Sequence, residues 1–214
     1  MAICGVSFDI CRVRVTSVDV AGNVTGAAYV SDNPISVSLN PNIETGNSFS
    51  VRNGCGCSIA RKKAADIFNW FEFTFNQAAL EPEMMALLLG SATIDVGADA
   101  VGMHFGSALG CDEDPAAVAF EFWTKHWVGS GVDAVLPWVH WVFPSTTWQL
   151  GDNTFEEGPA QPVVTGFSQA NNTWGTGPYA GQGPPDASSV VEGAWWKTAT
   201  DPPAASCAPL VVTT

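Results

Sequence analysis

The chain has 214 residues, of which 46% are hydrophobic, including nine tryptophans and 12 phenylalanines. This content excludes a wholly disordered chain and fits one β-rich domain, or one domain with extensions. The formal net charge of −13 argues against specific DNA or RNA binding, because such binding depends on Lys and Arg that neutralise phosphates.

Charged residues make up only 14% of the chain, whereas about a quarter is usual in soluble domains. A surface with so few charges indicates that other subunits cover much of it. The acidic balance itself fits two interpretations. It can form a negative channel that lets DNA pass without binding it, or it can serve solubility. Charge alone favours the second interpretation.

The N-terminal part of the chain alternates apolar and polar residues with the period of a strand. Residues 12–19 predict a half-buried strand in which Arg12 and Arg14 face away from the core. After a turn, residues 27–31 begin a return strand, and residues 35–39 alternate again. The residues expected to point inward are Val13, Val15, Ile35, Val37 and Leu39.

Residues 41–63 have no sustained period and are rich in Asn, Gly and Ser, which predicts a long inter-strand loop. Half of the chain's eight basic residues lie in it, so the loop differs from the acidic remainder. Loops of this length in a compact domain are usually either functional or disordered. We expect an ordered arm that contacts another subunit, with a floppy surface loop as the alternative. The candidate contact residues are Arg52, Arg61, Lys62 and Lys63.

Residues 81–90 predict a short helix. Pro82 lies near the first helical position, acidic residues occupy the first turn, and Gly90 can adopt a left-handed cap. The helix is too short to be stable alone, so it must pack against the end or side of a sheet. Its packing face is expected to hold Met84, Leu87 and Leu88.

Further strands are predicted from runs of β-branched and aromatic residues bounded by Pro and Gly. Pro144 is expected to end one strand before the next begins. Residues 92–107, rich in Gly and Ala, indicate a loop or an irregular strand. Alternate phenylalanines at Phe71, Phe73 and Phe75 are expected to share one face. The strands are expected at residues 67–76, 117–127, 138–143, 146–150, 162–170 and within 190–200.

These elements predict two parts. Residues 1–180 are interpreted as one mainly β domain that includes the long loop and the helix. Residues 181–214 are interpreted as a Pro- and Ala-rich C-terminal extension that contains a final strand. Neither a signal peptide nor a membrane-spanning apolar run is visible, so we expect a protein made in a cytoplasm.

No motif for catalysis, a metal or a cofactor stands out. The acidic run at 112–114 lacks the spaced ligands of a calcium loop and is expected to be a solvated turn. Glu156 and Glu157 are adjacent, so on a strand they point to opposite faces and cannot form a glycosidase pair. We expect no enzyme activity, no metal site and no cofactor. The histidines, which lack metal-ligand spacing, are His104, His126 and His140.

The cysteines are expected to be buried thiols, and two alternatives stay open: one or more disulfides, or a zinc site. The spacing of the first four differs from the paired knuckles of zinc sites. A bond between Cys55 and Cys57 would be strained in a regular strand. The six cysteines are Cys4, Cys11, Cys55, Cys57, Cys111 and Cys207.

An ordered set of segments resembles the major tail proteins, the tail tube subunits, of long-tailed phages that infect actinobacteria. The set begins with RVRVTSVD and ISVSLNPNIETG, and continues with KKAADIFNWFEFTF before EPEMMALLLG, and then FEFWTK. It ends with the stretch from Leu136 to Tyr179, which contains LPW, LGD, VTG and WGTGPY. The order of the segments, more than any one of them, carries the resemblance.

The resemblance implies a tail-tube-type β-sandwich or barrel with one short flanking helix. It implies that hexameric rings stack into the hollow tail tube of a virion, assembled in the host cytoplasm, through which the genome is ejected. The implied partners are other copies of the chain and the tape measure, terminator and tip proteins. DNA would pass without specific binding, and no membrane is involved. Further subunit-contact candidates are Trp138, Trp141 and Trp174.

Two other functions stay open. A tail-tip or minor tail protein would end a tube instead of extending it. A monomeric β-sandwich carbohydrate-binding module would stack sugars on exposed aromatic rings. The tryptophans available for such a platform are Trp138, Trp141, Trp148, Trp174, Trp195 and Trp196.

Overall fold

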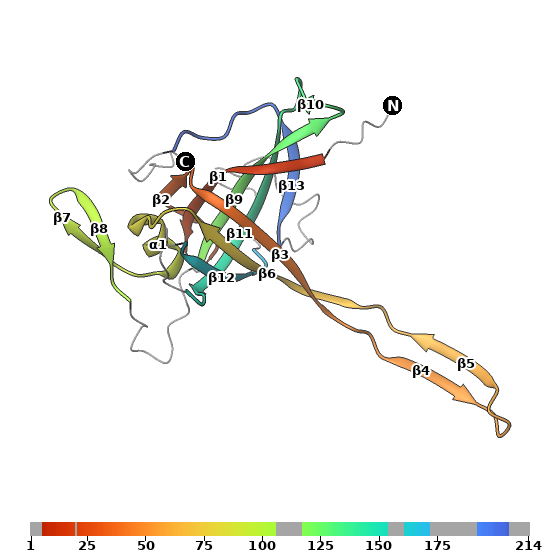
Figure 1. The fold of residues 1–214 in the computed structure, drawn as a ribbon. Coiled ribbons are helices and arrows are strands. Elements are labelled where there is room, and N and C mark those ends of the chain that lie inside the picture. The colour runs from red at the N-terminus through yellow and green to blue at the C-terminus, as the bar shows by residue number, and fades with distance from the viewer. Residues whose placement is uncertain (1–5, 20, 106–116, 154–160, 172–191, 206–214) are drawn as a thin grey trace.

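The computed structural model describes residues 6–19, 21–105, 117–153, 161–171 and 192–205. Figure 1 shows a body of strands with a short helix at one side, and a long two-stranded arm that projects from this body. The protein is mainly β, as the sequence predicts. Its elements are β1 (Val6–Val18), β2 (Val24–Ser31), β3 (Pro34–Glu44), β4 (Ser48–Arg52), β5 (Ser58–Lys63), β6 (Ile67–Gln77), α1 (Pro82–Leu89), β7 (Thr93–Val96), β8 (Asp99–Met103), β9 (Ala117–Val128), β10 (Gly131–Val132), β11 (Trp138–Leu150), β12 (Val163–Ser168) and β13 (Ala194–Thr198).

One antiparallel sheet of nine strands forms the body, with the main order β2–β1–β9–β11–β12–β6–β3. Beside this path, β10 pairs with β9 and β13 pairs with β11. Strands β3 and β1 lie near opposite ends of the order and still contact each other, so the sheet folds back on itself. This closure agrees with the expected sandwich or barrel. The hairpins β4–β5 and β7–β8 lie outside the main sheet.

The helix α1 packs against β1, β2, β8, β9 and β11, as its short length requires. Pro82 begins it, and Gly90 closes it in the left-handed conformation with φ 62°. Met84 and Leu88 are buried, as predicted. Met85 and Ala86 are buried as well, so the packing face is wider than the sequence indicates.

Aromatic rings fill the core. The ring of Trp148 lies 4.7 Å from that of Phe120 and 5.4 Å from that of Phe73. Its indole Nε1 donates a hydrogen bond of 2.7 Å to Thr146 Oγ1, which satisfies the one polar group that this side chain buries. Phe73 and Phe75 are both buried, which confirms the face predicted for this strand.

Strand β1 is covered on both faces, and this corrects the prediction of a half-buried strand. Val13 and Val15 are fully buried on the core side. On the opposite side, Thr16 is also fully buried, and so is Glu121, the residue of β9 that pairs with Arg14. The expectation was wrong because this second face holds an ion pair and its own small apolar cluster.

Strand β11 runs without interruption through Pro144, where the sequence predicts a break. Its pairing with β9 shifts register between Phe143 and Thr146. The chain therefore bulges at the proline, and a bulge is one of the few places where a strand tolerates a missing N–H. The bulge carbonyls still have partners: Ser145 O accepts from Gln169 N at 2.9 Å.

Ile35 and the segment 41–63 also differ from their predictions. Ile35 is 43% exposed, because β3 is the last strand of the sheet order and this residue lies at its start. The expected long loop contains the strands β4 and β5, so it is a regular hairpin. The expected loop or irregular strand at 92–107 likewise contains the hairpin β7–β8.

Candidate assembly surfaces

The arm continues from the ends of β3 and β6 into the hairpin β4–β5 (Figure 1). Every residue of β4 and β5 is exposed. Phe49 is 65% exposed and Ile59 is 67% exposed. An isolated two-stranded hairpin is at best marginally stable in water, and contiguous exposed apolar side chains mark interaction sites. The arm is therefore the first candidate contact surface.

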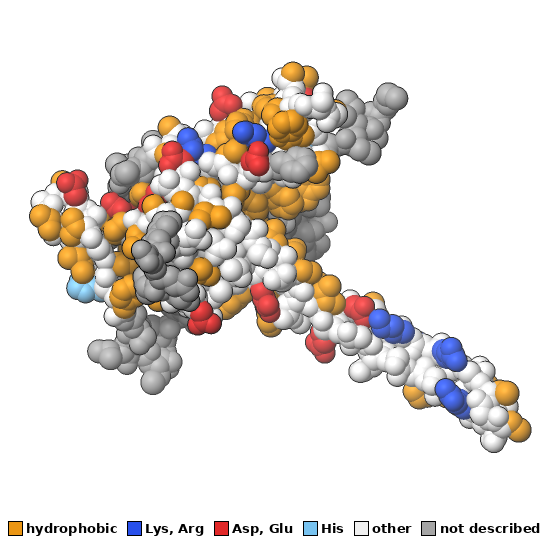
Figure 2. Space-filling view, in the orientation of Figure 1, with side chains coloured by type: hydrophobic (Ala, Val, Ile, Leu, Met, Phe, Trp, Pro, Cys, Tyr) orange, Lys and Arg blue, Asp and Glu red, His pale blue; other side chains and the backbone are white. Residues whose placement is uncertain are grey.

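The basic residues predicted to make subunit contacts all lie on this arm. Figure 2 shows the Lys and Arg side chains gathered along it, next to apolar atoms near its tip. Arg52, Arg61, Lys62 and Lys63 are exposed. The ammonium group of Lys63 lies 3.0 Å from Asp66 Oδ1 in an exposed ion pair. The structure thus brings these four residues together on one projection.

A short neck joins the arm to the body. Asp66 Oδ1 accepts a hydrogen bond of 2.9 Å from the amide of Gly46. Ala64 N donates to Asn47 O across the neck at 2.9 Å. The hydrogen bond from Gly46 and then that from Lys63 lower the pKa of Asp66 below its ordinary range. The two chains approach so closely here that a side chain at Gly46 has no space.

We expect Gly46→Ala to open the neck. The added Cβ would overlap the backbone oxygens of Ala64 and Ala65, which cannot move as a flexible side chain can. The body should keep its stability to within about 0.5 kcal/mol, because the site lies outside the core. Limited trypsin digestion should cleave the arm faster. Gly54→Ala is the control, because its Cβ meets no atom within 4 Å; equal digestion of the two variants would contradict the expectation.

The tip of the arm carries Cys55 and Cys57. Both thiols are free and exposed, so for this pair the expectation of buried thiols was wrong. The side chain of Asn53 orders the turn by accepting from the amides of Cys55 and Cys57 at 3.1 and 2.9 Å. Cys11 is free and partly buried. Cys4, Cys111 and Cys207 lie outside the described residues.

A second candidate surface is an apolar groove beside α1, at the opposite end of β6 from the arm. Its volume is about 520 Å³, and its walls come from α1, the β7–β8 hairpin and the ends of β11 and β12. Leu80, Val101 and Phe105 line it and are 62%, 58% and 75% exposed. No sequence pattern indicates this groove, because its walls come from segments that are distant in the sequence.

Glu81 is the charged residue among those that line the groove. Its Oε1 accepts a hydrogen bond of 2.8 Å from the neutral amide of Asn33. Its Oε2 is buried and has no hydrogen-bond partner in the described part of the chain. A buried carboxylate oxygen in this state lacks the stabilisation that a donor or a cation gives it.

The tryptophan candidates are in different environments. Trp138 is partly buried and donates from Nε1 to Asp201 Oδ1 at 3.1 Å. Trp141 stacks on Phe122 at 5.6 Å and packs against the core. Trp174 lies outside the described residues. Trp195 is 58% exposed on β13, and Trp148 is a core residue. The rings of Trp141 and Trp195 lie 5.7 Å apart, and the partly buried Trp196 lies 4.6 Å from the ring of His140. Because Trp148 is buried, the described tryptophans do not all lie on one exposed surface.

The outward face of β3, β6 and β12 is a third surface. Antiparallel pairing places Asn40, Glu72 and Phe167 in one row across the three strands. Serine, threonine and asparagine side chains occupy most of the neighbouring outward positions on β3 and β6. A hollow of about 490 Å³ lies over this face, between Trp70 and Phe167. Among the paired outward positions of the described residues, Glu72 is the charged side chain and its charge is negative.

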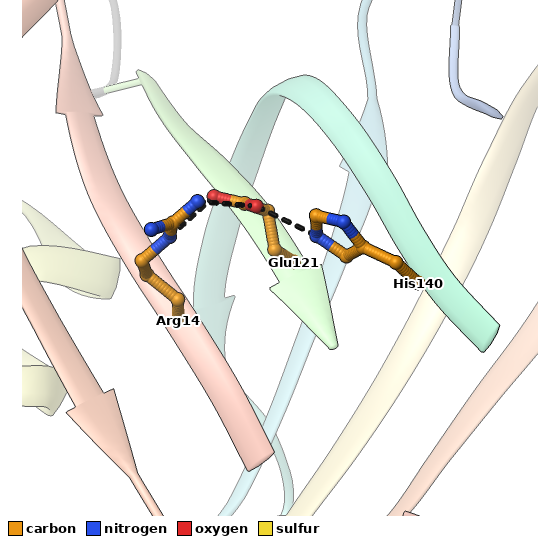
Figure 3. A network of polar contacts seen from close by, with 3 residues as sticks. All are labelled: Arg14, Glu121 and His140. Carbon is orange, nitrogen blue, oxygen red and sulfur yellow. Dashed lines mark hydrogen bonds and ion pairs between the residues drawn. The ribbon is translucent and has the colours of Figure 1, made fainter. Parts of the chain in front are cut away.

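A buried polar network fixes β1, β9 and β11 together (Figure 3). The guanidinium of Arg14 donates two hydrogen bonds of 2.7 Å to the carboxylate of Glu121. His140 Nε2 lies 2.8 Å from Glu121 Oε2, and the imidazole ring stacks on Trp123 at 4.2 Å. The predicted packing role of His140 is thus met by a stacked, hydrogen-bonded ring. Glu121 is not predicted from the sequence, because it lies inside an aromatic run.

The electrostatics of this network follow from its burial. Desolvation raises the pKa of Glu121, but the charge of Arg14 and the hydrogen bonds with His140 and Arg14 outweigh it. The net result is a pKa below the ordinary value of 4.5. The carboxylate is therefore charged at neutral pH although its side chain is fully buried. The network holds strands together.

Within the described ranges, no group of three or more His, Cys, Asp or Glu side chains is placed to hold a metal ion. In that same part of the chain, no helix combines the length and the apolar character that a membrane crossing requires.

No protein-family model and no curated protein matches this chain. Among solved structures, it is similar to a chain of an extracellular contractile injection system, the PVC sheath–tube complex in its extended state. The TM-score is 0.38 and the identity is 9%, over 89% of this chain and 92% of that chain. No family follows from these comparisons.

Proposed function

We propose that this protein is a structural subunit that polymerises with copies of itself into a hollow tube, the tail tube of a phage virion. The arm is the observation that carries the proposal. It exposes apolar side chains on a projection with no core of its own, so it needs a surface to pack on. The order of the sequence segments that resemble tail tube subunits supports the same function.

Charge separation within the chain also supports self-association. The strands and turn at residues 48–63 hold four basic residues and no acidic one. A charge of +4 on this hairpin leaves −17 on the remainder, because the whole chain carries −13. A basic projection on an acidic body attracts the body of another copy, and such complementarity sets the register and speeds the encounter.

In this proposal, rings are hexameric and stack along the direction of the arm. Residues 1–180 build the tube wall, and residues 181–214 form an extension whose strand β13 joins the main sheet. Other tail proteins terminate the tube, and the assembled tube belongs to the virion. The chain acts as a building block and not as an enzyme.

The outward face of β3, β6 and β12 is the proposed wall of the channel. Most of its described outward positions hold side chains with hydroxyl or amide groups, and Glu72 supplies a negative charge. A wall of this kind offers DNA no cation to neutralise its phosphates, so DNA passes without being held. The net acidic charge of the chain agrees with a channel that is weakly negative.

Charge reversal on the arm tests the proposal. We expect the variant Arg61→Glu, Lys62→Glu, Lys63→Glu to stay folded and monomeric while the unaltered chain forms rings or tubes in negative-stain micrographs. The reversed residues are exposed, so the core is untouched. The matched control exchanges the same residues without changing charge, as Arg61→Lys, Lys62→Arg, Lys63→Arg, and should assemble. Normal tubes from the charge-reversed variant would overturn the proposal for the arm.

A carbohydrate-binding function keeps one supporting observation. The hollow between Trp70 and Phe167 combines two partly exposed aromatic rings with the polar side chains of Asn40, Glu72 and Gln149. Aromatic rings and convergent polar groups are the usual means of sugar recognition. A chain that stays monomeric and binds glycans, and loses that binding on Trp70→Ala, would favour this second function over the first.

A further inference from the structure

We propose that the apolar groove beside α1 receives the arm of a second copy of this chain. In this contact Phe49 and Val51 enter the groove and Lys62 pairs with Glu81. The inference rests on the proposed self-assembly and specifies which two surfaces meet. Three independent features of the described residues support it: the placement of the two surfaces, their apolar character and their charges.

The two surfaces lie at opposite ends of the same pair of strands. β3 and β6 are antiparallel, and the arm begins beyond Glu44 and Ile67, which pair with each other. At the other end, Pro34 pairs with Gln77, and α1 begins at Pro82 a few residues later. The ends of β3 are roughly 30 Å apart at the usual rise per strand residue. An arm at one end and a groove at the other end make a head-to-tail contact, which repeats from copy to copy.

The groove has the chemistry of an unfilled site for apolar side chains. Leu80, Met85, Val101, Met103, Phe105 and Pro162 contribute to its walls. Leu80, Val101 and Phe105 are each more than half exposed in the single chain. Covering them removes apolar surface from water, which is the main favourable contribution to association.

The arm presents one face that matches the groove. Directly opposed residues of an antiparallel pair share a face, so Phe49 lies beside Lys62 and Val51 lies beside Ala60. This face is apolar and carries one cation. On the opposite face Arg61 and Lys63 lie beside serines, and the exposed Ile59 lies at the irregularity in the pairing of the two strands. The face that holds Phe49, Val51 and Lys62 therefore fits a groove that is apolar except for the carboxylate of Glu81.

Among the described residues, neither Lys62 nor Glu81 forms an ion pair. Lys63 has Asp66, but within the described residues Lys62 forms no ion pair. Glu81 has the neutral amide of Asn33, and its Oε2 is without a partner. A cation from another copy, placed beside the partly buried side chain of Glu81, supplies the opposite charge that this carboxylate lacks among the described residues. Because the apolar walls exclude water, the attraction between the two charges is less screened than on an open surface, and reversing one of them costs more.

A charge-exchange experiment tests this contact. Glu81→Lys alone and Lys62→Glu alone should each raise the protein concentration needed for assembly by about tenfold or more, because each places like charges face to face. An equimolar mixture of the two variants should assemble again. In the mixture the normal arm of one variant meets the normal groove of the other, and the two reversed surfaces are complementary as well. Sedimentation velocity and negative-stain microscopy would measure both effects.

Two variants, Lys62→Glu and Glu83→Lys, separate the loss of the contact from a folding defect. Lys62→Glu lies on the exposed arm and leaves the groove and the core unaltered. Glu83→Lys makes the same charge change as Glu81→Lys on the same helix, but Glu83 is not among the residues that line the groove. This variant should assemble near the concentration of the unaltered chain. Equal defects in Glu81→Lys and Glu83→Lys would overturn the assignment of the groove.

The outcomes distinguish a failure of the proposed self-assembly from a failure of the groove contact. If the unaltered chain stays monomeric at high concentration, the proposed function itself fails. If the unaltered chain assembles and Glu81→Lys assembles equally well, self-assembly stands and the groove contact is wrong. If both single variants fail to assemble and their mixture also fails, the pairing of Lys62 with Glu81 is wrong. Restored assembly in the mixture supports the contact.

Discussion

Replacing Arg14 with methionine should lower the free energy of unfolding by about 3–5 kcal/mol, as expected when one partner of a buried ion pair is removed. The side chain of Glu121 is fully buried and that of Arg14 is 19% exposed, so water compensates little. The variant would retain a buried carboxylate without the guanidinium that donates two hydrogen bonds to it. Urea denaturation followed by tryptophan fluorescence would measure the loss.

The matched control is Arg12→Met on the same strand. Arg12 lies 3.5 Å from Asp32, and both side chains are substantially exposed, at 31% and 47%. An exposed pair of this kind contributes about 0–1 kcal/mol. A loss for Arg14→Met no larger than that for Arg12→Met would contradict the role of the buried network.

The cost of Arg14→Met should also depend on pH. In the unaltered chain the pKa of Glu121 is lowered, so its contribution to stability is present above the unfolded-state pKa and is lost as pH falls through the folded-state pKa. In the variant, desolvation acts without the charge of Arg14, so the pKa of Glu121 rises and protonation relieves the buried charge. The difference in unfolding free energy between the two proteins should therefore shrink as pH is lowered from 7 towards 4. A difference that is constant over this range would contradict this explanation.

Phe120→Ala should lower the free energy of unfolding by about 3–5 kcal/mol, because it leaves a cavity in the aromatic core. The side chain of Phe120 is fully buried, and its ring lies between those of Trp148 at 4.7 Å and Phe75 at 5.5 Å. These rings are held by the strands on either side and cannot all move to fill the space. Thermal or urea unfolding would measure the effect.

Phe49→Ala is the complementary variant. The side chain of Phe49 is 65% exposed on the arm, so its removal should change the unfolding free energy by less than about 0.5 kcal/mol. It should nevertheless weaken assembly, because Phe49 enters the proposed contact. The pair of variants thus separates a phenylalanine that stabilises the fold from one that serves association. A stability loss in Phe49→Ala as large as that in Phe120→Ala would show that the arm packs on its own body.

Local patterns predicted the fold where one short segment decides the outcome. Proline at the start and glycine at the end delimit α1, and the alternating phenylalanines of β6 identify its buried face. The same reasoning failed at Pro144, because a bulge that depends on the partner strand accommodates the proline. It also failed for Arg14, whose burial depends on a carboxylate more than a hundred residues away in the sequence.

The candidate surfaces were predicted only in part. The cluster of basic residues indicated the arm, since composition alone distinguishes that segment from an acidic chain. The hairpin geometry that separates Lys62 from Arg61 follows from strand register, which the polar sequence of the segment does not reveal. The groove at Glu81 is formed by α1, β8 and the ends of β11 and β12 together, so it exists only in the folded chain.

Self-association into a tube is best tested by measuring the state of association of the purified chain over a wide range of concentration. Sedimentation velocity would give the size of the particles, and negative-stain microscopy would give their shape. We expect rings that stack into hollow tubes as the concentration rises. A folded monomer at every concentration, with no rings or filaments in the micrographs, would contradict it.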